Sequence, residues 1–304
     1  MTAKSQKIKA RFLRSCRRFN ILSFGWSIVR AVILLGLCFL ILYPFFIKIV
    51  NGFKSFNDFL DPTVRYIPKE PTWDNYVTAF EKMDYIPAFG RTLLVSVMSG
   101  VLQTLTSAIV GYGFARFHFR GNKALFACVI LVLLVPPQTI MIPLYEIFRF
   151  FLGTSTSLIN TQWPMLILSL TGLGLRNGLY IFMFRQSFRN MPKELEEAAY
   201  IDGCGVFRTF FSIMLPSAKS IIVTVLLFAF SWQWTDTFYN ELFFSGQSVL
   251  ASSVQLLTNL YDESVMNSMI QNVGAVLAVL PLAIFYLFAQ RSFVQSVERS
   301  GIVG

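Results

Sequence analysis

The residues that could do chemistry are few in this 304-residue chain, and they are widely scattered. His118 is its single histidine, and the four cysteines, Cys16, Cys38, Cys128 and Cys204, form no CxxC pair. This pattern excludes most zinc sites, disulfide frameworks and histidine-based acid–base pairs. The sequence also lacks HExxH and any GxxxxGK[ST] phosphate-binding loop. We therefore expect no metal site, no cofactor and no catalytic residues, and any ATP must be bound by another chain.

Arg176 is a basic residue near the middle of an apolar run. A charged side chain at the centre of a bilayer costs roughly 2.5–3.5 kcal/mol on insertion scales, so it should face a polar cavity or a partner. Arg176 and Asn177 are flanked by Gly172, Gly174 and Gly178, which would let helices approach closely or the backbone open. One interpretation is a hydrogen-bonding contact to a sugar, favouring an acidic one. The other is a structural arginine paired with a carbonyl or with Asp236.

A second group of candidate contacts ends a later apolar run, at Trp232, Gln233, Trp234 and Asp236. Aromatic faces beside amides and carboxylates suit sugar rings, which present C–H patches rimmed by hydroxyl groups. Tryptophan is also enriched at membrane interfaces for reasons unrelated to ligands. Both interpretations stay open at the level of sequence.

The stretch Pro192–Gly203 predicts a short helix between two apolar runs. Proline fits a first helical position, the acids of the first turn suit the helix dipole, and Gly203 suits the end. Ala198 and Ala199 carry almost no side chain, so a partner could approach closely. We interpret this helix as a docking element on the inner face of a membrane.

The elements that must position these residues are membrane-spanning helices. Of the residues, 55% are hydrophobic and only 14% are charged, against about 25% charged in an ordinary soluble domain. Each apolar stretch is close to the roughly 20 residues that cross a bilayer as a helix. We predict an all-α, polytopic membrane protein with six spans: Ser27–Val50, Thr92–Ala115, Ala124–Ile147, Trp163–Phe184, Ile221–Tyr239 and Val273–Ala289. Pro136, Pro137 and Pro143 should kink the third.

Basic residues gather before the first span, after the second and after the fourth. By the positive-inside rule, that side is cytoplasmic, both termini lie inside, and the docking helix between the fourth and fifth spans is cytoplasmic. A nucleic-acid partner is not expected, because no solvated basic face or known module is visible. We predict a basic N-terminal segment (1–26), a transmembrane domain (27–290, with the docking loop at about 190–216) and a tail (291–304).

The docking loop resembles the EAA loop of ABC-importer permease subunits. Glu197-Ala198-Ala199, then three residues, Gly203, nine residues, Ile213, one residue and Leu215-Pro216 match its spacing, with Asp202 also in place. Segments such as 113–121 and 136–145 resemble the branch that includes the maltose-system inner-membrane proteins. Arg91, Thr235 and the C-terminal Gly301–Gly304 depart from the pattern of many relatives.

The resemblance implies a transport subunit and not an enzyme. It implies a second homologous permease, a cytoplasmic ATPase dimer that binds ATP-Mg, and an extracytoplasmic sugar-binding protein. Glu197, Ala198, Ala199, Asp202 and Gly203 would then form the ATPase-coupling helix and its terminating turn. The implied cargo is a sugar or oligosaccharide.

Three alternatives are weighed against this interpretation. The same machinery could carry another solute, such as a glycerol-phosphate, a peptide or a metal chelate. An intramembrane enzyme would need a catalytic set, such as paired aspartates, that this sequence lacks. A stand-alone channel or secondary transporter would leave the EAA spacing unexplained, and many such transporters have duplicated halves.

Overall fold

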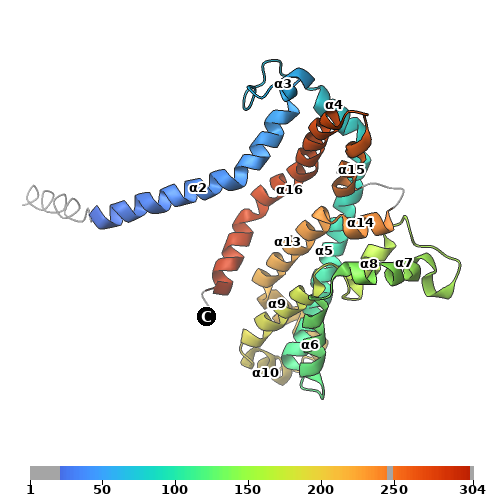
Figure 1. Cartoon of the computed structure of the whole chain (residues 1–304). Helices are drawn as coiled ribbons and strands as arrows, with labels where there is room; N and C mark the ends of the chain where they lie inside the picture. Colours follow the sequence, from blue (N-terminus) through green and yellow to red (C-terminus); the bar gives the residue numbers. More distant parts are fainter. Residues whose placement is uncertain (1–20, 245–248, 302–304) are drawn as a thin grey trace, which may run out of the picture. The chain divides into compact units, whose positions relative to one another are not determined.

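The computed structural model describes residues 21–244 and 249–301, and the side chains of residues 25–244 and 249–290 within them. The chain divides into two compact units, Met1–Thr72 and Trp73–Gly304. The described residues contain helices and loops but no strand, which confirms the all-α prediction (Figure 1). The predicted tail at 291–304 and most of the predicted segment 1–26 lie outside the described side chains.

The first unit consists of a long apolar helix and a folded loop. Helix α2 (Ile21–Gly52) contains the predicted first span, and Gly25–Gly52 is long and apolar enough to cross a membrane. Helix α3 (Phe56–Leu60) begins after Ser55, whose Oγ accepts a hydrogen bond from the Asp58 amide at 3.3 Å.

Charged side chains hold the rest of this loop together. The Lys54 ammonium group donates to the Val64 carbonyl at 2.7 Å, and the Asp58 carboxylate accepts from the Glu70 amide at 2.9 Å. Asp61 and Lys69 form an ion pair at 2.7 Å. The Lys69 hydrogen bond, with those from Thr63, holds the pKa of Asp61 well below its usual range.

The second unit begins with two helices joined through Asp84. These are α4 (Asp74–Lys82) and α5 (Tyr85–Arg116). The elements that follow up to the docking loop are α6 (Asn122–Val132), η1 (Pro137–Ile140), α7 (Met141–Arg149), η2 (Phe151–Gly153), α8 (Trp163–Leu170) and α9 (Asn177–Asn190). The docking loop and the rest comprise α10 (Glu194–Ile201), α11 (Val206–Thr209), η3 (Phe210–Met214), α12 (Leu215–Ser217), α13 (Lys219–Thr235), α14 (Phe238–Phe243), α15 (Leu250–Leu256), η4 (Leu257–Asn259) and α16 (Ser264–Gly301).

Helix α5 is the centre of the second unit, and α8, α9, α13 and α15 pack against it. Small residues let α9 approach it closely. A Cβ added at Gly111 would lie 2.6 Å from the Phe184 Cβ and 2.9 Å from the Arg185 backbone nitrogen. By contrast, a Cβ at Gly113 would meet nothing within 4 Å. Close backbone approach through small residues is the usual way in which helices associate in a membrane.

A proline in α16 leaves one carbonyl group of that helix without its usual donor, and a side chain of α5 donates to it instead. Pro281 lies inside α16 and has no N–H to donate to the Leu277 carbonyl four residues earlier. The hydroxyl of Tyr85, at the start of α5, donates to that carbonyl at 3.1 Å. The two helices are therefore joined at the point where the ladder of α16 is interrupted.

Three helices, in α2, α5 and α16, are each long and apolar enough to cross a membrane. Two more candidates appear if bent pairs count as one span: Asn122–Val132 with Pro137–Gly153, bent by 98°, and Val206–Ser217 with Lys219–Thr235, bent by 80°. The predicted bend at Pro136-Pro137 is therefore present. Pro143 lies inside α7, which continues through it.

The predicted fourth span, Trp163–Phe184, is not one continuous helix. Helix α8 ends at Leu170 and α9 begins at Asn177. Between them Gly172 has φ +78° and Arg176, the N-cap of α9, has φ +60°, and both values lie in the left-handed region, which a continuous helix does not contain. The hydrophobicity of the stretch does not distinguish one long helix from two short ones. The predicted fifth span, Ile221–Tyr239, is also shorter than expected, since α13 stops at Thr235.

Candidate functional site

Helix α10 forms within the predicted stretch, but it begins at Glu194 after Lys193, so Pro192 precedes the helix and does not occupy its first position. The end of α10 has a defined geometry. Glu194, Glu196 and Glu197 occupy its first turn, where the helix dipole favours negative charge. Gly203 has φ +81°, and its amide bonds to the Tyr200 carbonyl at 3.0 Å, while the Cys204 amide bonds to the Ala199 carbonyl at 2.9 Å. These are the two hydrogen bonds of a Schellman motif, so Gly203 stops the helix sharply.

One face of α10 is bound to the C-terminal end of α5 through the side chain of Glu196. The Tyr112 hydroxyl donates to Glu196 Oε1 at 2.6 Å, and Arg116 Nε lies 2.9 Å from Glu196 Oε2. The Arg116 and Glu196 side chains are only 7% and 10% exposed. Arg116 Nη2 also donates to the Met191 carbonyl at 3.0 Å, just before α10. A buried pair with these additional hydrogen bonds resists separation, because losing one partner would leave the other charge uncompensated.

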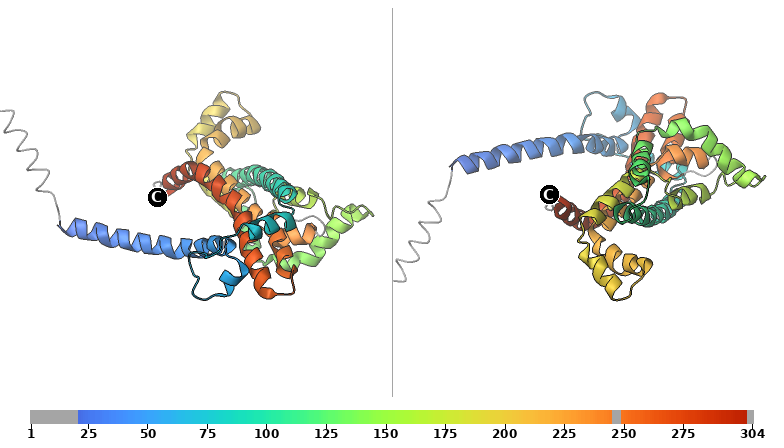
Figure 2. Two further views of the ribbon diagram at one scale, coloured as in Figure 1. Left: turned by 90° about the horizontal axis from the view of Figure 1, so that it is seen from above. Right: turned by 90° about the horizontal axis from the view of Figure 1, so that it is seen from below.

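The opposite face of α10 is open. Of the predicted coupling residues, Glu197, Ala198, Asp202 and Gly203 are exposed, whereas Ala199 is buried and packs within the chain. The exposed surface also includes two large apolar side chains that sequence reasoning did not single out, Ile201 at 86% and Phe207 at 81% exposure. Figure 2 shows that the segment containing α10 projects from the rest of the second unit. Scattered exposed hydrophobics are common, but two on a projecting helical loop suit a protein partner.

The loop continues into α13 through irregular helix. The segment η3 is a π-helical turn, and the axis bends by 80° between Val206–Ser217 and Lys219–Thr235. Such single π-turns occur often at functional sites. The backbone between α10 and α13 therefore contains a π-helical turn and one bend of 80°, whereas side chains connect α10 directly to α5.

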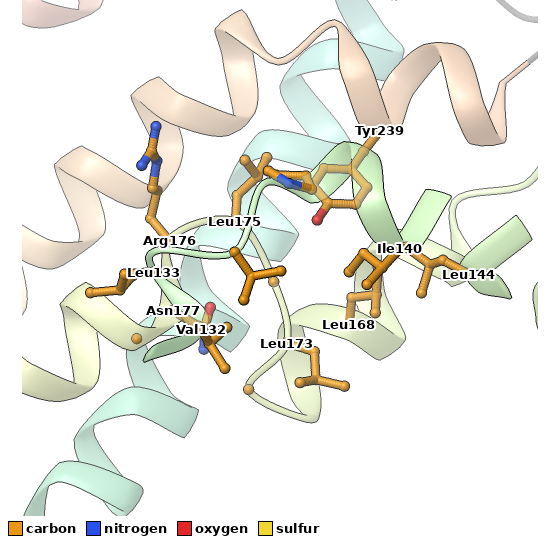
Figure 3. A pocket seen from close by; sticks show the side chains of 15 residues that line it. Val132, Leu133, Ile140, Leu144, Leu168, Leu173, Leu175, Arg176, Asn177 and Tyr239 are labelled. Carbon is orange, nitrogen blue, oxygen red and sulfur yellow. The ribbon is translucent and has the colours of Figure 1, made fainter. Parts of the chain in front are cut away.

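The second set of predicted residues surrounds the break between α8 and α9. The Arg176 guanidinium lies over the Trp232 ring, 4.6 Å from its centroid. Both side chains are exposed, and Figure 3 shows Arg176 pointing away from the aliphatic side chains around the nearby cavity. No ion pair joins Arg176 to Asp236 in the part of the chain that the structure describes. A guanidinium group stacked on tryptophan can still donate hydrogen bonds from its edge, which is the contact that the sugar interpretation requires.

Asn177 differs from its neighbour because it is buried. Its amide nitrogen donates to Ser107 Oγ at 3.3 Å, and Gln103 Nε2 donates to Ser169 Oγ at 3.2 Å. A Cβ at Gly174 would lie 2.9 Å from the Gln103 amide nitrogen and 3.1 Å from Asn177 Oδ1. A side chain at position 174 would have to displace the Gln103 amide, so the break between α8 and α9 is packed closely against α5.

The remaining residues of this set are structural in this conformation. Trp234 is buried and donates its indole N–H to the Ala278 carbonyl at 3.0 Å. Asp236 accepts from the Asn240 amide at 3.1 Å and so binds the first turn of α14. Gln233 is buried, with its amide nitrogen 3.9 Å from Met165 Sδ. Of this set, only Arg176 and Trp232 present their side chains to an open surface.

A cavity of about 360 Å³ lies beside this break (Figure 3). Its walls are mostly aliphatic, with Leu173, Leu175 and Ile140 among them, and its polar groups come from Arg176, Asn177 and Tyr239. A sugar needs hydrogen-bond partners for its hydroxyl groups, so these walls alone do not make a sugar site. No cluster of three or more His, Cys, Asp or Glu suited to a metal occurs among residues 21–244 and 249–301.

Comparison with known proteins identifies the family. Residues 103–299 match the model of the family described as binding-protein-dependent transport system inner membrane component. This match spans more than half of the chain and includes all of α10.

Two relatives are named for carbohydrate transport. A probable starch degradation products transport system permease protein from Thermoanaerobacterium thermosulfurigenes is 28% identical, over 84% of this chain and 89% of the relative. A melibiose/raffinose/stachyose import permease protein from Bacillus subtilis is 26% identical, over 86% and 91%.

A solved structure shares the fold. It is a chain from a bacterial ABC transporter involved in the import of the acidic polysaccharide alginate. The TM-score is 0.65 at 20% identity, and the match covers 90% of this chain and 99% of that one.

Proposed function

The chain belongs to the binding-protein-dependent transport system inner membrane components, and on that premise we propose that α10 is the coupling helix through which an ATPase drives sugar transport. The chain is a multi-pass permease subunit of an ABC importer for sugars or oligosaccharides. It is not itself an enzyme, because in this family the ATPase is a separate subunit. The carbohydrate relatives favour sugars over the glycerol-phosphate or peptide alternative.

The proposed topology has six crossings with both termini in the cytoplasm. Three long helices and two bent pairs supply up to five crossings by length and composition. The broken segment of α8 and α9 would supply the sixth, because non-helical backbone is tolerated at membrane depth where protein buries it. Burial of Asn177, Ser169 and Ser107 at this break supports that assignment.

The proposed partners are an ATPase dimer at α10, a second homologous permease and an extracytoplasmic binding protein. The single observation that carries the coupling role is the division of α10 into two faces. Glu196 fixes one face to α5, while Glu197, Ala198 and Asp202 remain exposed on the other. A partner that binds the exposed face would therefore move a helix that is bound through Glu196 to α5, the central helix of the bundle.

The experiment is transport by the reassembled complex in proteoliposomes. Labelled raffinose, maltotriose and arabinotriose would be offered with the binding protein, and sugar uptake and ATP hydrolysis would be measured together. Glu197→Lys should abolish uptake and uncouple ATP hydrolysis while the subunit still inserts. Glu194→Lys makes the same charge change on another exposed first-turn acid outside the matched motif, and it should retain more transport.

Normal uptake by Glu197→Lys would refute the docking role. Uptake by vesicles that contain this chain alone would refute the subunit assignment itself. Uptake of a peptide but none of the sugars would overturn the substrate class while leaving the coupling helix in place.

A further inference from the structure

A basic pocket lies beside the start of α6 and the C-terminal half of α9. The loop 117–121, the first turn of α6 and two residues of α9 line it. Its cationic side chains are those of Arg120, Lys123, Arg185 and Arg189, with His118 beside them, and no acidic residue lines it.

Among the described residues, these cations have no carboxylate partner. None of the four makes an ion pair in the part of the chain that the structure describes, where the pairs are Lys69–Asp61 and Arg116–Glu196. Arg185 Nε is buried and has no hydrogen-bond partner among the described residues. Arg185 and Arg189 are also four residues apart on one helix, an arrangement in which like charges repel. An anion in the pocket would relieve this repulsion.

The backbone at the pocket favours the same kind of ligand. Gly121, with φ +90°, precedes the first residue of α6, and the eleven-residue helix begins in the pocket wall. Amide groups at a helix N-terminus attract phosphate and other anions. The helix end and the four side chains therefore act together.

The surroundings are apolar and exposed. The Arg185 guanidinium lies 3.9 Å from the centroid of the Phe126 ring, and Phe117 and Phe119 of the loop are 45% and 46% exposed. Leu125, in the first turn of α6, is 53% exposed. A soluble anion would gain nothing from these apolar groups, whereas a lipid could place its headgroup among the cations and its acyl chains along them.

We propose that this pocket binds the phosphate headgroup of an anionic phospholipid. In Figure 1 the loop before α6 lies at the same end of the second unit as α10. In the proposed topology that end faces the cytoplasm, so the lipid would come from the inner leaflet. The assignment of the lipid to the inner leaflet rests on the proposed function, whereas the binding of the lipid by the pocket does not.

The test is lipid binding by the full-length chain in detergent, titrated with phosphatidylglycerol or phosphatidylcholine of the same acyl chains and read by native mass spectrometry. Each lysine or arginine near an anionic lipid contributes roughly a fivefold preference. The wild type should therefore bind phosphatidylglycerol more tightly than phosphatidylcholine. Arg185→Gln with Arg189→Gln, and separately Arg120→Gln with Lys123→Gln, should each weaken that binding roughly 25-fold and leave phosphatidylcholine unchanged.

The control pair is Lys193→Gln with Arg208→Gln. It removes the same charge from exposed positions of the docking loop that do not line the pocket, and phosphatidylglycerol binding should stay at the wild-type level. Because the two test pairs lie on different elements, each checks the other against misfolding, which circular dichroism would report. Equal binding of both lipids by the wild type, or an equal loss in the control pair, would overturn the proposal.

Two other ligands give distinct results. If inorganic phosphate at millimolar concentration displaces phosphatidylglycerol and binds with the same dependence on the four cations, the pocket is a phosphate site and the lipid proposal is wrong. If the wild type shows no lipid preference and the test pairs instead lose the ATPase subunit from the purified complex, the pocket is a protein contact. Failure of sugar transport would leave the lipid measurement unaffected, so the two proposals fail separately.

Discussion

Replacing Glu196 with glutamine should loosen α10 from α5 without unfolding the bundle. The change removes the negative charge that lies 2.9 Å from Arg116 Nε, in a pair whose side chains are 7% and 10% exposed. Breaking a buried pair costs roughly 3–5 kcal/mol when the remaining charge stays buried. Glutamine can still accept from Tyr112, and Arg116 keeps the Met191 carbonyl, so the lower end, about 3 kcal/mol, is expected.

Hydrogen exchange of the α10 amides measures this loss directly. A local destabilisation of about 3 kcal/mol raises the opening equilibrium roughly a hundredfold. The reporting amides are those of Asp202 and Cys204, which bond to the Ala198 and Ala199 carbonyls. Amides in the middle of α5 should exchange as in the wild type, because the bundle itself remains packed.

The neighbouring glutamate is the matched control. Glu197 is exposed, so Glu197→Gln should leave the exchange of α10 unchanged in the isolated chain. A double variant, Glu196→Leu with Arg116→Met, should recover most of the protection, since replacing both buried partners with apolar groups is often close to neutral. The same exchange rates in Glu196→Gln as in the wild type would refute the idea that this pair holds α10 in place.

Other substitutions test the packing and the termini of helices. Gly111→Ala should lower the melting temperature by forcing α5 and α9 apart, at a cost of roughly 1–3 kcal/mol, whereas Gly113→Ala should not, because its Cβ meets nothing within 4 Å. Gly203→Val should fray the end of α10 by roughly 1–2 kcal/mol through its left-handed φ, and Gly203→Asn should cost less, which exchange of the following amides would show. Tyr85→Phe should cost roughly 1–3 kcal/mol by leaving a carbonyl of α16 unpaired, and the cost should shrink in a Pro281→Ala background, measured by thermal unfolding.

Sequence reasoning succeeded where a local signal was strong. The helix predicted within Pro192–Gly203 is α10, although it begins at Glu194 and not at Pro192, and the Gly203 that follows it has the left-handed backbone expected of a terminating glycine. The paired prolines at 136 and 137 mark a bend of 98°. Each of these features depends on a few adjacent residues whose backbone preferences differ sharply from those of their neighbours.

Sequence-based prediction failed where a residue's position depends on contacts between segments that are distant in the sequence. Arg116 and Glu196 are on separate helices. Three glutamates lie in the first turn of α10, and the sequence does not indicate that Glu196 is the one that faces inward. One weak signal was present: Glu196 lies three residues before the small, buried Ala199, on the same face of the helix. Trp232 and Trp234 were equivalent candidates in the sequence, yet one is exposed beside Arg176 and the other is buried in the core.

The break between α8 and α9 was missed for a different reason. In an apolar stretch nearly every position is hydrophobic, so periodicity cannot distinguish one long helix from two short ones. Gly172 and Gly174 were noted as points where the backbone could open, but glycine is also common in continuous membrane helices. The amides of Gln103 and Asn177, which close around Gly174, belong to different helices and come together only in the folded bundle.

The two faces of α10 bear on how motion at an ATPase would reach the sugar path. If the backbone were the only connection between α10 and the rest of the bundle, a displacement of α10 would change the geometry of the π-helical turn and the 80° bend before it reached α13. The contacts of Glu196 with Tyr112 and Arg116 do not pass through that irregular segment, and they join α10 directly to the end of α5. Since α8, α9 and α13 all pack against α5, a displacement of α10 would move the helix that these elements share. A transporter in which Glu196→Gln left uptake intact would have to transmit the motion through α13 alone.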